Sequence, residues 1–470
     1  MPPPLALALT LLLIFYLFRR ESKLPYKPSP AIWIPTVWML IIGSRSFSEW
    51  VSLGAPLSRG GSIEEGSPLD RMVFFSLIAV GLIVLLGRHI SWSHLIRNNV
   101  WLLLFVFYCG ISITWSDFPE VAFKRWVKAL GDLIMVMILL SDPQPLKAVE
   151  TLVRRCAYIL IPFSILFIKY YPAYGRVYSE WTGEVLYTGV TTNKNLLGYI
   201  CFVCGLFFVY TVFGKRGRGR LPIAREEMVI SVAFVFMVVW LFGLADAKTA
   251  LSCLFISSLI ALGLGFGTVR RYFGRVLIVS LVLYGVLHLW LGVTEILIES
   301  LGRNTTLTGR TELWPVVLEM ANSPMLGEGF ESFWLGERLK KLQDMWYFKP
   351  NQAHNGYIEM YLNLGWIGLL IFAGVVVSCY KGVRETLMRS FDAENAELDD
   401  FSRIGMGYLI AYLIFNVTDA SFKPLNFLFV WFLIFTMRYP SKASNVPQLS
   451  TASLARAERV NEFGTLGVGI

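Results

Sequence analysis

Residues 353–377 read AHNGYIEMYLNLGWIGLLIFAGVVV, and this stretch decides what kind of protein the chain forms. A polar pair, His354 and Asn355, runs directly into an apolar segment in which Glu359 is the only charged residue up to position 379. About 20 apolar residues are enough for a helix to cross a bilayer, so we predict a transmembrane span over residues 356–379. The imidazole should then lie at the mouth of a membrane helix.

Two interpretations of His354 follow from this position. Imidazole titrates near neutral pH, which makes His354 a candidate general base at a membrane surface. The alternative is a histidine that only caps the entry to the helix, and position alone does not separate the two. Within the same segment, the spacing of Gly365 and Gly368 predicts one helical face that a neighbouring helix approaches closely.

The composition of the whole chain is that of a polytopic membrane protein. Over 470 residues it is 55% hydrophobic, with a mean hydropathy of +0.57, which excludes an ordinary soluble globular protein. A net charge of +9 is compatible with nucleic-acid binding. The basic residues, however, are scattered over the ends of apolar runs, so we interpret them as topology determinants and expect no nucleic-acid partner.

Thirteen apolar runs predict an all-α fold with about 12–13 transmembrane helices. We expect residues 1–440 to form one membrane domain, and the polar, weakly patterned residues 441–470 to form a disordered cytoplasmic tail. The runs are residues 3–18, 31–43, 72–87, 100–115, 126–140, 156–170, 196–213, 228–245, 250–267, 276–293, 356–379, 404–420 and 424–437.

The Lys and Arg residues in the connectors predict the orientation of these spans. One alternate set of short connectors contains 21 basic residues and the opposite set contains 9. Because cytoplasmic connectors are the more basic ones, the first set should face the cytoplasm. The loop between the tenth and eleventh spans, residues 294–354, then faces outward with His354 at its end.

This outer loop carries a helical pattern. Leu313, Val316, Val317 and Met320 recur at the spacing of an amphipathic helix. The aromatic residues in the segment 330–334 predict anchors at the membrane interface. We therefore expect the loop to lie on the membrane as a lid over a cavity between helices.

Two basic residues near this face are candidates for binding an anion. Lys248 follows Asp246 in a short outer turn, and it either offers a cation to a phosphate or simply pairs with Asp246. Arg310 lies at the predicted start of the lid helix, where helix N-terminal amides would add to its guanidinium group. The alternative for Arg310 is an exposed loop arginine.

A second outer loop contributes further candidates. The polar cluster TTNKN at residues 191–195 includes Lys194 and stands at the entry to another span, and Arg176 lies in the same loop. The alternative role for Thr192 or Asn193 is to cap that helix.

Motifs for metal or nucleotide binding are absent from the sequence. It contains no H-E-x-x-H, no P-loop and no outward cluster of His, Cys and carboxylates at metal-ligand spacing. We therefore expect neither a catalytic metal nor a nucleotide cofactor.

Several motifs resemble those of one bacterial family. His354 and Asn355, then nine residues, Gly365, two residues and Gly368 resemble the H-[N/S/Q]-x9-G-x-x-[G/T/Y] signature of the O-antigen ligase and polysaccharide polymerase superfamily. The segment GRTELW at 309–314 with GEGF at 327–330 is similar to the start of that family's large periplasmic loop. The pieces EGSPLDR (65–71) and TTNKNLLG (191–198) look more like its exopolysaccharide polymerase branch. Many members carry a Ser-Arg pair where this chain has Ala247-Lys248-Thr249.

The resemblance implies an inner-membrane, metal-independent glycosyltransferase with a helical periplasmic loop. Its donor would be a glycan on undecaprenyl diphosphate and its acceptor a saccharide, with other polysaccharide assembly proteins as partners. His354 would act as the base. The leaving diphosphate would be stabilised by Arg310, Lys248, Arg176 or Lys194, and Asn355 would orient the imidazole or an acceptor hydroxyl.

Three functions are compatible with these features. The first is exopolysaccharide polymerisation, and the second is ligation of O-antigen to lipid A-core. A third, of another class, is a transporter that flips lipid-linked oligosaccharide without chemistry. Transporters often contain internal repeats, and none is visible here.

Overall fold

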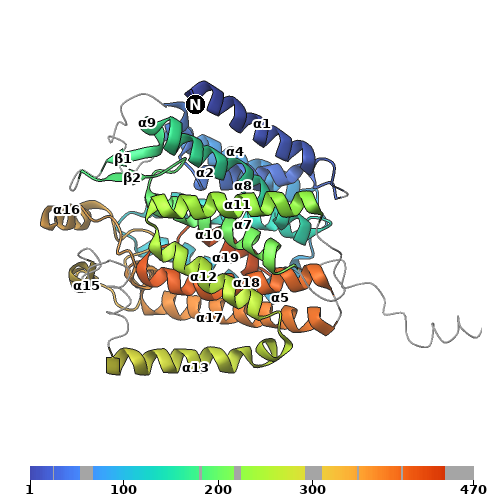
Figure 1. Ribbon diagram of the computed structural model, residues 1–470. Coiled ribbons are helices and arrows are strands. Elements are labelled where there is room, and N and C mark those ends of the chain that lie inside the picture. Colours follow the sequence, from blue (N-terminus) through green and yellow to red (C-terminus); the bar gives the residue numbers. More distant parts are fainter. Residues whose placement is uncertain are drawn as a thin grey trace, which may run out of the picture.

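The computed structural model describes residues 1–24, 26–52, 67–178, 183–215, 224–291, 310–346, 349–392 and 395–439. In these ranges each of the thirteen predicted apolar runs coincides with a helix, and the long helices run side by side in a bundle (Figure 1). These helices are α1 (Pro3–Glu21), α2 (Trp33–Ile42), α4 (Pro68–Leu86), α6 (Val100–Ile111), α7 (Pro119–Leu140), α8 (Pro145–Tyr170), α10 (Lys194–Phe213), α11 (Arg225–Ala245), α12 (Lys248–Gly263), α13 (Gly267–Leu291), α17 (Gly356–Asp392), α18 (Ala396–Thr418) and α19 (Phe427–Thr436).

Short helices connect them. They are η1 (Pro30–Ile32), α3 (Phe47–Val51), α5 (Trp92–Asn98), η2 (Ser112–Trp115), α9 (Pro172–Gly175), α15 (Arg310–Glu319) and α16 (Gly336–Met345). The predicted tail at 441–470 lies outside the described residues.

The membrane class is confirmed by the lengths of the helices. Seven described helices are long and apolar enough to cross a membrane, namely α1, α4, α8, α10, α11, α17 and α18. An eighth span results if α5 and α6, which meet at 87°, count as one broken span. The predicted number of 12–13 is larger because several apolar helices, such as α2 and α19, are too short to pass the same test.

The all-α class is confirmed, and the described residues add one short hairpin to the helices. Strands β1 (Arg176–Tyr178) and β2 (Val185–Tyr187) pair antiparallel, with Val177 opposite Leu186. Each strand has only three residues, too few to show an alternating pattern in the sequence. The hairpin extends from the bundle at the end where α15 and α16 also lie (Figure 1).

Helix α17 is broken at Gly365, whose φ of +63° and ψ of −167° are not helical. The prediction that Gly365 and Gly368 share one helical face is therefore wrong. A Cβ at Gly365 would collide with the carbonyl oxygen of Met325, so the glycine admits the loop and not a neighbouring helix. Four backbone hydrogen bonds join the loop to the break: Glu328 N to Leu362 O (3.0 Å), Gly329 N to Asn363 O (2.9 Å), Trp366 N to Pro324 O (2.9 Å) and Ile367 N to Met325 O (3.2 Å).

The outer loop packs around its own small core. The predicted amphipathic helix is confirmed as α15, with Leu313 and Val317 fully buried. Phe333 and Trp334 are buried against them and against Leu362 of α17. The prediction that these aromatic residues anchor at the membrane interface is therefore wrong, because they fill the core beneath the lid.

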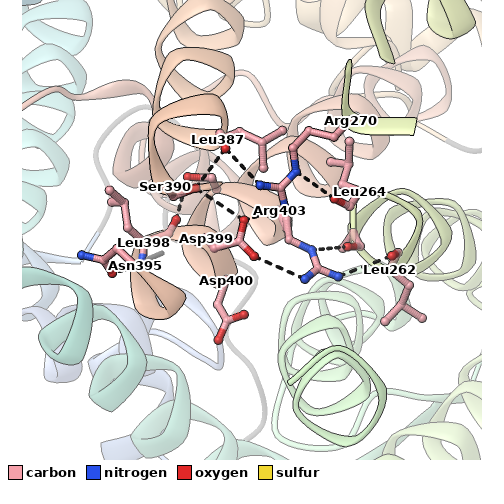
Figure 2. A network of polar contacts seen from close by, with 12 residues as sticks. Leu262, Leu264, Arg270, Leu387, Ser390, Asn395, Leu398, Asp399, Asp400 and Arg403 are labelled. Carbon is pink, nitrogen blue, oxygen red and sulfur yellow. Dashed lines mark hydrogen bonds and ion pairs between the residues drawn. The ribbon is translucent and has the colours of Figure 1, made fainter. Parts of the chain in front are cut away.

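A network of charged side chains ties helices together at the opposite end of the bundle (Figure 2). The carboxylate of Asp399 in α18 receives Arg270 Nη2 at 2.6 Å and Arg403 Nη1 at 3.4 Å. Arg270 also donates to the carbonyls of Leu264 and Leu387, and Arg403 to that of Ala261. One partly buried carboxylate thus joins the α12–α13 turn to α17 and α18.

Replacing Asp399 by Asn should destabilise the protein. Two buried guanidinium groups would then share a site without a counter-charge, and breaking a buried ion pair on one side costs about 3 kcal/mol or more. Thermal unfolding of the purified protein should therefore begin at a lower temperature. The control is Asp344→Asn, which changes an exposed aspartate of α16. Equal unfolding temperatures for the two variants would contradict the role of Asp399.

Candidate functional site

His354 lies at a fixed corner between the outer loop and α17. Its φ of +52° is left-handed, a conformation that L-residues rarely adopt. On one side, Ala353 donates its N–H to Glu359 Oε1 (2.5 Å) and accepts from Trp314 Nε1 (2.9 Å). Because Trp314 belongs to the lid helix α15 and Glu359 to α17, both elements set the position of the imidazole.

The residue that caps α17 is Asn355. Its side-chain oxygen accepts from the backbone N–H groups of Tyr357 and Ile358, at 3.0 and 3.1 Å. Its Nδ2 donates to the carbonyl of Val417 at 3.1 Å. The alternative in which His354 caps the helix is therefore wrong, and the imidazole takes no part in holding the helix end.

The imidazole instead faces Asp419, just beyond the end of α18. Oδ1 of Asp419 lies 3.8 Å from Nδ1 of His354, and Oδ2 accepts from the Tyr199 hydroxyl at 2.7 Å. The carbonyl of Asp419 accepts from Gly356 N at 2.9 Å, which fastens the corner to α18. Sequence reasoning missed Asp419. Its one signal was the polar run Asn-Val-Thr-Asp at 416–419, directly after an apolar segment.

The Asp419 carboxyl is held in its charged form. Burial alone would raise its pKa, but the neighbouring His354 imidazole and the hydrogen bonds from the Tyr199 hydroxyl and the Ala420 amide outweigh burial and lower that pKa below the ordinary value. Asp419 is therefore ionised at neutral pH. Its contribution to stability is present there and is lost only as the pH falls through the lowered pKa.

A second side chain, that of Gln352, lies close to Nδ1 of His354 and also contacts Lys423. Gln352 Nε2 lies 3.2 Å from Nδ1, and Gln352 Oε1 accepts from Lys423 Nζ at 3.0 Å. Lys423 stands in the connector between α18 and α19, which sequence reasoning treated only as a topology signal. Gln352 thus connects the imidazole to the positive charge of Lys423.

Lys194 and Lys248 come together beside this site. Their ammonium groups lie 3.8 and 3.6 Å from the carboxylate of Asp246. The predicted pairing of Lys248 with Asp246 is therefore present, and Lys194 approaches the same carboxylate. The capping alternative for Asn193 is also confirmed, since its side chain accepts from Leu196 N at the start of α10.

A small pocket lies between Asp419 and the residues that follow the two lysines in the chain. Its volume is about 20 Å³, and its lining includes Asn195, Thr249, Thr418 and Asp419. The hydroxyls of Thr418 and Thr249 lie 3.3 Å apart across it. The start of α10, the α11–α12 turn and the end of α18 therefore meet next to the His354 corner.

The other predicted residues lie elsewhere or act locally. Arg176 begins β1, donates to the carbonyl of Ile168 at 2.9 Å and stacks over the Tyr187 ring. No contact of Arg176 in the described residues brings it to His354. Arg310 is the first residue of α15, as predicted, and its side chain lies outside the described part of the structure.

This arrangement can move a proton and bind an anion. An imidazole beside an ionised carboxylate can accept a proton, because the carboxylate stabilises the resulting positive charge. Lys194 and Lys248, at the starts of α10 and α12, can offer positive charge to a phosphate. In the described ranges, no group of three or more His, Cys, Asp or Glu residues is placed to hold a metal ion.

Two comparisons with known proteins agree with this geometry. Residues 186–373 match the family described as O-antigen ligase, a segment that includes Lys194, Lys248 and His354 and ends before Asp419. The chain is also 22% identical over 364 residues to "Exopolysaccharide production protein ExoQ" of Rhizobium meliloti (strain 1021), which covers 74% of this chain and 77% of that protein. The resemblance drawn from the motifs is confirmed: residues 186–373 match the O-antigen ligase family.

Proposed function

We propose that this protein is a membrane glycosyltransferase that moves a glycan from an undecaprenyl-diphosphate carrier to an acceptor sugar, and that its product is an exopolysaccharide. The observation that carries the proposal is the pairing of His354 with ionised Asp419 beside the Lys194–Lys248 cluster. The similarity to an exopolysaccharide production protein favours polymerisation.

In the proposed reaction, His354 removes the proton from the acceptor hydroxyl. The acceptor oxygen then attacks the anomeric carbon of the donor, and the bond from that carbon to the diphosphate oxygen breaks. The electron pair of this bond leaves with the lipid diphosphate, and the proton stays on the imidazole. Direct displacement inverts the anomeric configuration, and Asp419 stabilises the imidazolium that forms.

The leaving diphosphate needs positive charge nearby. Lys194 and Lys248 supply it next to Asp419, and Lys423 adds a further charge beside the imidazole through Gln352. Arg310 and Arg176 are proposed as additional contacts for the donor. Asn355 has a positioning role through the cap that fixes the His354 corner. We propose no metal or nucleotide cofactor for this reaction.

We place the site on the periplasmic face of a bacterial inner membrane, with residues 294–354 as the lid, about 12–13 spans within residues 1–440, and a cytoplasmic tail at 441–470. The excess of basic residues in the opposite set of connectors supports this orientation. A lipid-linked donor suits a site on this face, where nucleotide-activated sugars are not supplied.

The orientation can be tested by thiol labelling. In a His354→Cys variant whose native cysteines are replaced, a membrane-impermeant maleimide should label position 354 in intact spheroplasts. The six native cysteines are buried, so the variant without them, carrying His354, is the control that should not be labelled. If position 354 is labelled only after the membrane is permeabilised, the site faces the cytoplasm and the proposal is overturned.

The chemistry can be tested with purified protein and a lipid-linked donor. His354→Ala should lower the transfer rate by at least about 100-fold, since it removes the base, while the Kd for the donor stays within about twofold. Asp419→Asn keeps the shape of the side chain but removes its charge, so it should lower the maximal rate with little change in donor binding. His89→Ala, in an exposed connector, is the matched control. Turnover retained by His354→Ala would refute the mechanism.

A second candidate function is ligation of O-antigen to lipid A-core, which the description of the matching family favours. Glycan profiles of a deletion strain separate the two functions. We expect long secreted polysaccharide to disappear while lipopolysaccharide keeps its O-antigen. Bare lipopolysaccharide core with normal secreted polymer would instead identify a ligase.

A further inference from the structure

Helix α13 stands apart from the rest of the bundle (Figure 1). Between it and helices α17 and α18 lies a cavity of about 780 Å³. The cavity is lined from α13 by residues between Arg271 and Ile278, from α17 by residues between Val376 and Arg384, and from α18 by Leu409, Ile410 and Leu413. It shares no lining residue with the His354 site.

The base of this cavity is a fixed structure. The start of α13 is held by Arg270, which is buried, pairs with Asp399 and donates to the carbonyl of Leu387 in α17 (Figure 2). Arg270 also stacks over the Phe391 ring at 4.8 Å. The first turn of α13 is therefore attached to α17 and α18 at the base of the cavity.

One end of the groove is strongly basic. Arg271, Arg275 and Arg384 all line it, together with the hydroxyl-bearing side chains of Tyr272 and Tyr380. Arg271 and Arg275 both stack on the Tyr272 ring, at 5.8 and 5.4 Å. Among the described residues, no carboxylate lies within ion-pair distance of these three guanidinium groups, whereas their neighbour Arg270 has Asp399.

The remainder of the groove is apolar. Its lining there consists of Leu277, Ile278, Val376, Val377, Leu409, Ile410 and Leu413. Val376 precedes Arg384 by eight residues, about 12 Å along a helix. The groove therefore changes from cationic to hydrocarbon-like over a distance close to half the thickness of a bilayer core.

We propose that this groove binds one anionic glycerophospholipid, such as phosphatidylglycerol. Its phosphate would contact Arg271, Arg275 and Arg384, and an acyl chain would lie along the apolar lining between α13 and α17. Three positive charges, without a carboxylate partner among the described residues, favour a lipid with net negative charge over a zwitterionic one, whose own cation would be repelled. In the proposed orientation, the lipid belongs to the cytoplasmic leaflet.

Native mass spectrometry of the purified full-length protein tests this, with phosphatidylglycerol and phosphatidylcholine of equal chain length as probes. We expect one phosphatidylglycerol molecule to stay bound and phosphatidylcholine to be lost. The triple variant Arg271→Gln, Arg275→Gln, Arg384→Gln should lower phosphatidylglycerol affinity about 100-fold, at about fivefold for each lost charge. Arg389→Gln, an exposed arginine of α17 outside the groove, is the control and should bind normally.

Each outcome decides the proposal. Equal retention of both phospholipids, or unchanged binding by the triple variant, would overturn it. Preferential retention of an added polyprenyl phosphate over phosphatidylglycerol would overturn the assignment to a phospholipid. If the triple variant does not fold, the three single variants and a triple Arg→Lys variant replace it. Each single variant should weaken phosphatidylglycerol binding. The triple lysine variant should retain phosphatidylglycerol binding. Because the readout is lipid retention, the result is independent of the proposed transfer reaction.

Discussion

The arrangement of the site depends on an exchange of backbone hydrogen bonds at the break in α17. In an unbroken helix, the N–H groups of Trp366 and Ile367 would donate to the carbonyls of Leu362 and Asn363. The break at Gly365 leaves these two N–H groups and two carbonyls without helical partners. Residues 324–329 of the loop form hydrogen bonds with all four. A membrane interior offers no water to replace lost partners, so the break and the loop stabilise each other. This fixes the lid on the bundle.

The contact between the loop and the break in α17 also helps to set the position of His354. The lid core formed by α15, α16 and the start of α17 holds Ala353 through Trp314 and Glu359. The end of α18 holds the other side through the Asp419 carbonyl. The imidazole is therefore located by contacts from α15, α17 and α18, and Asp419 approaches it from the end of α18. Lys194 and Lys248 lie at the starts of α10 and α12, where both approach Asp246. Charges gathered at helix ends, partly shielded from water, interact more strongly than they would on an open surface.

Hydropathy and motif spacing predicted the helices, the lid helix and the placement of His354 at a helix mouth. These features depend on local patterns of apolar residues, which a single sequence displays. Asp419 could not be predicted because its importance comes from contacts with His354 and Tyr199, 65 and 220 residues away in the chain. The break at Gly365 was also hidden, since glycine is compatible with both a close helix contact and a left-handed residue. Phe333 and Trp334 were misplaced because burial beneath a lid and insertion at a membrane surface select the same aromatic residues.

The left-handed backbone of His354 also limits how this position can vary. Glycine and asparagine adopt left-handed backbone angles at little energetic cost, whereas a β-branched residue is sterically disfavoured there. Exchange to glycine would therefore relieve local strain while it removes the ring, so the fold would gain stability and the base of the proposed reaction would be lost. Under that proposal, a histidine at this corner is a compromise between robustness and reactivity.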